Sequence, residues 1–384
     1  MTVVVVAGAL ANKPGKGGEA WVRLSWARGL RQLGLEVFLL EEIDSATCVD
    51  AQGAPCDVSE SVNLEQFRRV ARDFDLDDRA VLLTDDGRHF GAPVDVVDVA
   101  TEARLLLNIS GNLRRRELLA RFAHRAYVDI DPYFTQAWHL DGRLGDALDR
   151  HDLHVTIAEN IGSPDCGIPT AGFEWIATRQ PVVFDDWPVT ADGGSDRLTT
   201  VATWRSPSGT VAWNGRSAGE KAHGFRRFAE LPQHVEQRLE LALEIHPGDE
   251  RDRRKLLEHG WRLVDPAVAG TPEAFRSYVQ SSAGEFSVAQ PSYVESRSGW
   301  FSDRSVRYLA SGRPVLVQDT GFGRTIETGC GIVPFTTFPE AVAGARSIAQ
   351  RPDDHCEAAR KAAERFFDAQ VVLPELLERC GVAA

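Results

Sequence analysis

Basic residues and serines gather in one segment of an otherwise acidic chain, SRSGWFSDRSVR at 296–307. Its three arginines are Arg297, Arg304 and Arg307. Guanidinium groups bind phosphate oxygens, Gly299 permits a tight turn, and Ser302 with Asp303 can cap the helix predicted to follow. Capping alone explains the serine and the aspartate. The concentration of cations at a predicted strand-to-helix junction nevertheless favours an anionic ligand.

A second pair of basic residues precedes this segment. Arg205 ends a predicted strand, and Lys221 opens the next predicted helix after a glycine-bearing, hairpin-like loop. A guanidinium at a strand end and an ammonium at a helix start can together bind a diphosphate. Solvated surface charges are the alternative interpretation of this pair.

The loop NKPGKGG lies between the first predicted strand and helix and contains Lys13, Lys16, Gly17 and Gly18. Free backbone N–H groups and the helix dipole favour an anion at such a place. The loop has the spacing of neither a dinucleotide-binding fingerprint nor a P-loop. A flexible turn with two solvated lysines and a ligand-binding loop both stay open.

Composition limits the partners. The 384 residues carry a formal net charge of -13, so the general attraction to a phosphate backbone is missing and no nucleic-acid partner is expected. The six cysteines are scattered without zinc-ligand spacing, so no metal site is expected. The apolar run after Met1 is too short for a signal sequence or a membrane span, and we expect a cytoplasmic protein without an integral membrane segment.

Strands and helices alternate along the chain. The β-branched run TVVVVAGAL predicts a strand buried on both faces of a parallel sheet. Apolar residues at helical spacing predict a helix over 21–34, and LEVFLLEE returns as a strand at 35–42. Residues 3–42 are therefore predicted to form a βαβ unit.

This alternation continues to residue 160, stops in the Pro/Gly/Asp-rich stretch 185–196 and restarts at 197. We therefore predict an α/β fold of two doubly wound Rossmann-like domains, residues 1–190 and 197–365. Open parallel sheets bind ligands at the carboxyl ends of their strands. The two domains are accordingly expected to face each other across a cleft that holds the ligand.

The segment 286–321, FSVAQPSYVESRSGWFSDRSVRYLASGRPVLVQDTG, resembles the nucleotide-sugar-binding segment of GT-B glycosyltransferases. That segment runs as strand, glycine-containing loop, helix, A-x-G-x-P-V strand and small-residue turn. The N-terminal unit resembles the first βαβ unit of the same fold. The final segment, 366–384, is similar to the C-terminal helix that packs back toward the N-terminal domain in this fold.

The resemblance implies a division of roles between the domains. The second domain would bind the donor, through Arg205, Lys221, Gly299, Ser302, Asp303, Arg304, Asp319 and Thr320. The first domain would receive the acceptor, with Gly17, Gly18 and Asn160 in its cleft loops.

The chain departs from the family at two positions. Retaining members commonly carry two glutamates there, and this sequence has Gly299 and Arg307 instead. The sugar and ribose contacts of those carboxylates cannot be carried over. Asp303 and Asp319 are candidates to replace them, and the stereochemistry of transfer stays open.

The activity implied is transfer of a sugar from a nucleoside-diphosphate sugar to a hydroxyl of a small molecule or glycan, without a cofactor or metal. Transfer needs a stabilised leaving diphosphate and, with inversion, a base. Asp131 is the predicted base, with Glu159 as a second candidate catalytic residue at a strand end of the first domain. The motif DID at 129–131 superficially resembles a metal-binding D-x-D, but two carboxylates are an incomplete cation site.

Two other functions fit the same fold. A non-hydrolysing sugar-nucleotide epimerase would need no acceptor, and a non-catalytic sugar- or nucleotide-binding subunit would explain the absent carboxylates. The sequence does not identify the sugar, the nucleotide, the acceptor, the base or the oligomeric state.

Overall fold

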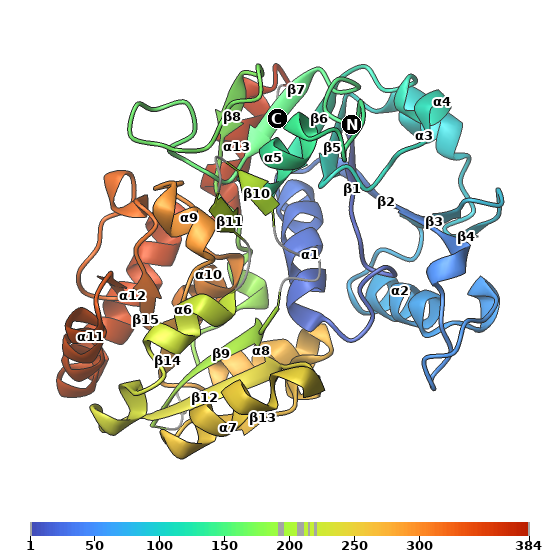
Figure 1. The fold of residues 1–384 in the computed structure, drawn as a ribbon. Coiled ribbons are helices and arrows are strands. Elements are labelled where there is room, and N and C mark those ends of the chain that lie inside the picture. The colour runs from blue at the N-terminus through green and yellow to red at the C-terminus, as the bar shows by residue number, and fades with distance from the viewer. Residues whose placement is uncertain (1, 191–195, 206–210, 214–215, 219–220, 383–384) are drawn as a thin grey trace.

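The computed structural model describes residues 2–190, 196–205, 211–213, 216–218 and 221–382 (Figure 1). Within these residues the strands form two large sheets and one small antiparallel pair. The pair consists of β10 (Val211–Trp213) and β11 (Arg216–Ala218).

The first sheet has the order β4-β3-β2-β1-β5-β6-β7-β8, and all neighbours are parallel except β3 and β4. Its strands are β1 (Val3–Ala7), β2 (Glu36–Ile43), β3 (Ala80–Thr84), β4 (His89–Gly91), β5 (Leu105–Ile109), β6 (Arg125–Asp129), β7 (Leu153–Thr156) and β8 (Trp175–Ala177). Every residue of β1, β3 and β5 is buried, as a parallel sheet covered on both faces requires.

The second sheet has the order β13-β12-β9-β14-β15-β16 and is parallel throughout. Its strands are β9 (Arg197–Thr203), β12 (Arg238–Glu244), β13 (Arg262–Val264), β14 (Gly284–Ser287), β15 (Val315–Gln318) and β16 (Ile332–Phe335). In both sheets the strand order reverses beside the first strand, which is the doubly wound arrangement. The predicted fold class is confirmed.

Helices cover these sheets. Those of the first half are α1 (Gly17–Gln32), α2 (Val62–Asp73), α3 (Val96–Glu102), α4 (Arg116–Leu119) and α5 (Phe134–Leu140). Those of the second half are α6 (Lys221–Arg227), α7 (Glu250–Glu258), α8 (Pro272–Gln280), α9 (Pro291–Glu295), α10 (Asp303–Ala310), α11 (Phe338–Gln350), α12 (Pro352–Phe366) and α13 (Ala369–Arg379). The domain limits 1–190, 197–365 and 366–384 stay a prediction.

Helix α1 lies between the two halves of the molecule (Figure 1). It begins at Gly17, whereas the sequence predicted a turn up to residue 20 and a helix from Trp21. The reason is close packing: a Cβ atom at Gly17 would lie 2.1 Å from the carbonyl oxygen of Thr271, just before α8. Two glycines in the first turn let the second domain approach the helix backbone, so they serve packing as well as the loop.

Side chains strengthen this contact. The indole of Trp21 donates a hydrogen bond to the carbonyl of Pro272 at 2.8 Å. Arg307 of α10 is fully buried, and its guanidinium donates to the carbonyl of Trp21 at 3.1 Å and to the Ser25 hydroxyl at 2.9 Å. Burial lowers the pKa of Arg307. Arg307 therefore joins the two domains.

The C-terminal helix α13 packs on the opposite part of α1. A Cβ atom at Gly29 would lie 2.6 Å from Leu373 and 2.8 Å from Ala369. The backbone on either side of Asp368 pairs with Val182, through hydrogen bonds of 2.8 and 2.9 Å. Both ends of α1 thus have neighbours distant in sequence. None of the helices in the described ranges is long and apolar enough to cross a membrane.

We expect Gly17→Ala to destabilise the protein by about 1–3 kcal/mol, because the new methyl group would overlap the Thr271 backbone. Urea unfolding measures the difference. The control is Gly323→Ala, where the nearest atom, in Thr328, is 3.8 Å from the added Cβ and a change within about 0.5 kcal/mol is expected. Equal stability of the two variants would contradict the packing described for α1.

Candidate functional site

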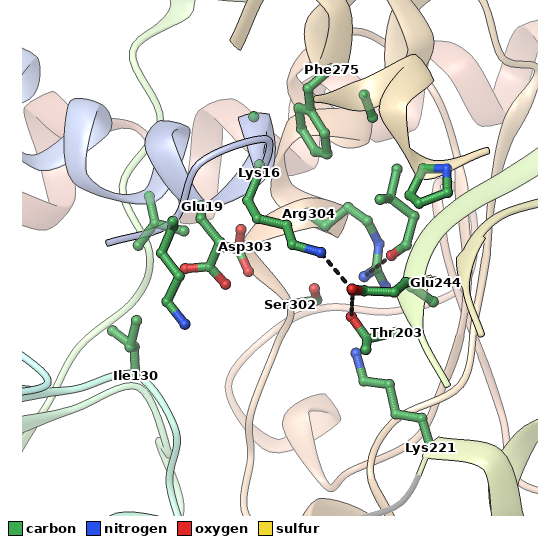
Figure 2. Close-up of a pocket in the computed structure, with 18 of the residues that line it drawn as sticks. Lys16, Glu19, Ile130, Thr203, Lys221, Glu244, Phe275, Ser302, Asp303 and Arg304 are labelled. Atoms are coloured by element: carbon green, nitrogen blue, oxygen red, sulfur yellow. Dashed lines mark hydrogen bonds and ion pairs between the residues drawn. The ribbon is translucent and has the colours of Figure 1, made fainter. Parts of the chain in front are cut away.

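A cavity of about 320 Å³ lies between the domains, at the carboxyl ends of β1, β6, β9 and β12 (Figure 2). Its walls come from the loop before α1, the turn after β6, the end of β9 and the start of α10. Open parallel sheets usually bind ligands at the carboxyl ends of their strands, next to the point where the strand order reverses. Both sheets present that edge to the same cavity.

The loop before α1 is held by polar side chains from behind. The Glu41 carboxylate of β2 accepts backbone N–H groups of Leu10, Ala11 and Asn12, at 2.8, 2.6 and 2.7 Å. Burial raises the pKa of Glu41 to about 7, although these three donors favour the carboxylate. The Gln66 amide of α2 donates to the carbonyls of Leu10 and Lys13. These hydrogen bonds restrict the conformation in which the loop enters the cavity.

Two basic residues of the second domain form one wall. Arg304 donates to Glu285 at 2.5 Å, to the Ser287 hydroxyl at 2.5 Å and to the carbonyl of Val201 at 2.9 Å. Burial alone would lower the pKa of Arg304, but the neighbouring Glu285 carboxylate outweighs this effect and the pKa is raised. These contacts fix the guanidinium against the cavity.

Lys221 stands beside Arg304 at the start of α6. Among the described residues its ammonium has no hydrogen-bond or ion-pair partner. Burial, followed by repulsion from Arg304, lowers the pKa of Lys221 to about 8. An anion between the two cations would relieve that repulsion.

Three further basic residues line the same cavity, Lys13, Lys16 and Arg205, and the latter two are each bound to a carboxylate. Arg205 is bidentate to Asp249, at 2.7 and 2.6 Å, and its side chain is about half exposed. Lys16, from the loop before α1, reaches across to Glu244 at the end of β12, with 2.5 Å between Nζ and Oε2. The latter ion pair joins the two domains (Figure 2).

The first domain contributes acidic groups. Asp131 follows β6 and lines the cavity, where burial in the cleft and then the charges of Glu19 and Asp129 raise its pKa to about 6. Glu19, in the first turn of α1, pairs with Arg23, which lowers the pKa of Glu19 against the effect of burial. Asp131 is therefore the carboxyl group whose pKa lies closest to neutral at this wall.

The turn that carries Asp131 is fixed by Asp129. This buried carboxylate accepts hydrogen bonds from Thr135, Gln136 and Thr156, at 2.7, 2.9 and 2.8 Å, and from the Asp131 backbone at 3.1 Å. The next turn holds Tyr133 at φ 76, a strained conformation for a tyrosine. Asp129 thus orients Asp131 instead of facing a ligand.

No family model matches the sequence, and no curated protein matches it. Solved structures do. An alpha-glucosyltransferase in complex with UDP superposes with a TM-score of 0.62 at 10% identity, over 99% of this chain and 100% of that one. The same-named enzyme with UDP and a 13-mer DNA that contains an A:G mismatch gives 0.61 at 10% identity, over 99% and 100%. Anabaena HepE in complex with UDP gives 0.57 at 13% identity, over 99% and 100%.

The chain has the GT-B fold. At this level of identity the likeness concerns architecture alone, and it confirms the fold that the sequence resemblance implied.

Most of the predicted site residues meet at the GT-B cleft. Those that line the cavity are Gly17, Gly18, Asp131, Arg205, Lys221, Ser302, Asp303 and Arg304. Glu159 does not line it: Arg179 binds both of its carboxylate oxygens at 2.8 Å, and these two residues line a separate pocket. Of the two aspartates proposed to replace the absent glutamates, Asp303 lines the cavity and Asp319 does not.

Four other predicted residues lie outside the cavity: Asn160, Gly299, Asp319 and Thr320. Asn160 and Gly299 meet where the two domains join, whereas the hydrogen bonds of Asp319 and Thr320 stay within the second domain. The Asn160 amide donates to the carbonyls of Arg297 and Gly321, at 2.9 and 3.0 Å. A Cβ atom at Gly299 would lie 2.9 Å from Asn160, and the Gly299 N–H donates to the Thr320 carbonyl. Close contact across the domains accounts for the glycine.

The cavity also contains residues that the sequence analysis missed: Glu19, Glu244, Tyr293 and Trp300. Glu244 ends a buried strand, so the rule that strand ends carry polar site residues could have found it. Glu19 directly follows the glycine pair that was noticed. Tyr293 and Trp300 carry no such signal. Over the described residues, no group of three or more His, Cys, Asp or Glu side chains gathers as metal ligands would.

We expect Glu41→Gln to lower the free energy of unfolding by about 1–3 kcal/mol, because an amide NH₂ would face a backbone N–H donor of the loop. The matched control is Glu36→Gln on the same strand, whose partner Arg79 is partly exposed and whose loss should cost less than about 1 kcal/mol. Chemical denaturation compares the two. A Glu41 variant as stable as the control would contradict the role given to this carboxylate.

Proposed function

We propose that this protein is a glycosyltransferase that moves a sugar from a nucleoside-diphosphate sugar to an acceptor hydroxyl. One observation carries the proposal. A lysine that has no partner among the described residues and a fixed arginine line one wall of an interdomain cavity, and a carboxyl group with a pKa near 6 lines another. Proteins of the same fold that hold UDP support a nucleoside diphosphate as the anion.

On the donor side, the leaving diphosphate would lie between Lys221 and Arg304. The first turn of α10 is beside them, and its backbone N–H groups add partial positive charge. Arg205 lines the same cavity and would contact the phosphate that lies farther from the nucleoside. Because these groups supply the positive charge that a leaving diphosphate needs, we propose transfer without a metal ion. Activity that persists in EDTA is the expected result.

On the acceptor side, Asp131 would accept the proton of the attacking hydroxyl. A pKa of about 6 suits a general base at neutral pH, because the Asp131 carboxylate is then deprotonated and still basic enough to accept a proton. The rings of Tyr293 and Trp300, with 4.6 Å between their centroids, form an aromatic surface beside it. Glu159, held by Arg179, takes no part in the proposed reaction.

We propose a small molecule or a glycan as the acceptor. The net charge of -13 opposes binding to a phosphate backbone. Since a structural relative holds DNA, the alternative has a direct test: retardation of duplex DNA at low salt would contradict this part of the proposal.

The two alternative functions separate in one assay with a panel of sugar nucleotides. An epimerase would convert the donor without an acceptor. A non-catalytic subunit would bind the donor and show neither transfer nor hydrolysis over a broad acceptor panel.

We expect UDP, the nucleotide present in the structural relatives, to bind and Lys221→Met to weaken that binding about 10- to 100-fold, through loss of a charged hydrogen bond. Affinity for the wild-type protein should fall as the pH rises through about 8, where the ammonium loses its proton. Isothermal titration calorimetry measures both effects. Lys255→Met, on the exposed helix α7, is the control, and an equal loss in both variants would refute the role of Lys221.

We expect kcat/KM for transfer to rise with pH through about 6, as Asp131 loses its proton, and to decline above about 8 with Lys221. Asp131→Asn should lower kcat by about 100-fold or more and abolish the acidic limb of the profile. Asp141→Asn, outside the cavity in the same domain, serves as the control. An unchanged acidic limb in the Asp131 variant would rule this residue out as the base.

A further inference from the structure

The ion pair between Lys16 and Glu244 occupies part of the cavity that the proposed reaction needs. The carboxylate belongs to the second sheet, and the ammonium comes from the first domain. Their side chains are 41% and 51% exposed, and the Thr203 hydroxyl lies 3.4 Å from the same carboxylate oxygen. An ion pair this exposed contributes little to stability, so a ligand can displace it at low cost.

Glu244 has a distinctive place in the sheet. It is the last residue of β12. Within the second sheet, β12 is the next strand after β9 along the chain, and the two strands pair directly. In dinucleotide-binding Rossmann domains a carboxylate beyond the second strand accepts hydrogen bonds from the ribose hydroxyls. The glutamates that contact the sugar and ribose in GT-B relatives are replaced here by Gly299 and Arg307. Glu244 therefore offers a carboxylate at a strand end of the second sheet, in addition to Asp303 of the donor segment.

Other carboxylates near the cavity are less suited to that role. Asp249 is occupied by Arg205, and Glu285 is completely buried against Arg304. Asp303 lies close enough to Lys221 and Arg304 for its charge to favour the protonated form of both, so it neighbours the proposed diphosphate site. Glu244 is thus the acceptor group on the wall of the second sheet that a ribose can reach.

The surroundings of Glu244 fit a nucleoside. Pro266 and Ala269, which follow β13, line the same cavity and offer an apolar surface for a base. Lys221 and Arg304 line it as well, as the diphosphate requires. A ribose between base and diphosphate would bring its hydroxyls to the end of β12.

We propose that Glu244 binds the ribose hydroxyls of the donor nucleotide and that the nucleotide displaces Lys16 from it. The carboxylate then accepts one or two O–H hydrogen bonds in place of the ammonium. Lys16, which stays in the loop at the cavity, turns its charge to the diphosphate. Glu244 thereby selects ribonucleotides over deoxyribonucleotides. This inference rests on the proposed function, because it requires a nucleoside diphosphate in the cavity.

The test compares UDP with its 2′,3′-dideoxy analogue by isothermal titration calorimetry. We expect the wild-type protein to prefer UDP by about tenfold or more, the usual effect of losing hydrogen bonds to a charged group. Glu244→Ala should abolish most of that preference, because alanine leaves no oxygen to accept the ribose hydroxyls. Lys16→Met should retain it, because the carboxylate that reads the ribose is still present. Asp165→Asn, which removes a cross-domain ion pair with Arg324 outside the cavity, is the control and should bind both nucleotides like the wild type.

Each outcome has one meaning. Equal binding of both nucleotides by the wild-type protein, or a preference that survives in Glu244→Ala, refutes the ribose contact and leaves the proposed function intact. If Glu244→Ala and Lys16→Met lose the preference alike, the ion pair itself is what matters and the inference is wrong. If the wild-type protein binds neither nucleotide, the proposed function fails and the inference fails with it.

Discussion

Close packing around the backbone of α1 is the constraint on which the rest of the structure depends. The second domain touches this helix at Gly17, where no Cβ can fit, and the C-terminal helix touches it at Gly29. Hydrogen bonds from Trp21 to Pro272 and from Arg307 to Ser25 add direction to the contact. Because α1 is also the helix that follows β1, this packing determines how the carboxyl ends of both sheets face one another.

The polar groups of the molecule divide into those that hold structure and those that face the cavity. Glu41 accepts hydrogen bonds from the loop before α1, and Asp129 accepts them from the segment after β6. Glu285 accepts a hydrogen bond from Arg304. Such satisfied buried carboxylates keep their neighbours rigid. Lys221 and Asp131 are left with shifted pKa values in the cavity, on opposite domains. Separation of a cationic wall from an acidic one suits a reaction in which an anion departs and a proton is removed.

The two positions at which this chain departs from the GT-B sequence pattern have a physical explanation. Gly299 lies too close to Asn160 for any side chain, and Arg307 extends into α1. Both positions therefore serve the joint between the domains. A carboxylate at residue 307 would leave Ser25 and the Trp21 carbonyl without their donor. Asp303, one helical turn earlier, keeps an acidic group at the cavity.

Local patterns in the sequence were sufficient for the alternation of strands and helices, the glycine loop and the basic residues Arg205, Lys221 and Arg304, because each depends on neighbours within a few residues. Short elements without such a pattern, α5 and β16 among them, were missed. The start of α1 at Gly17 was missed as well, because it depends on Thr271, distant in the chain.

What the sequence by itself determined is thus the fold class and the chemical types available: an acidic α/β chain with cations after its strands. Only the tertiary structure decided which of these groups meet. It places Asp303 and Asp131 at the cavity and Asp319 and Glu159 outside it. It also brings Lys16 into contact with Glu244. The physical reason is that the periodicity of apolar residues indicates only which side of one helix or strand is buried. The site forms where the strand ends of two sheets converge, and this convergence depends on packing between residues far apart in the chain.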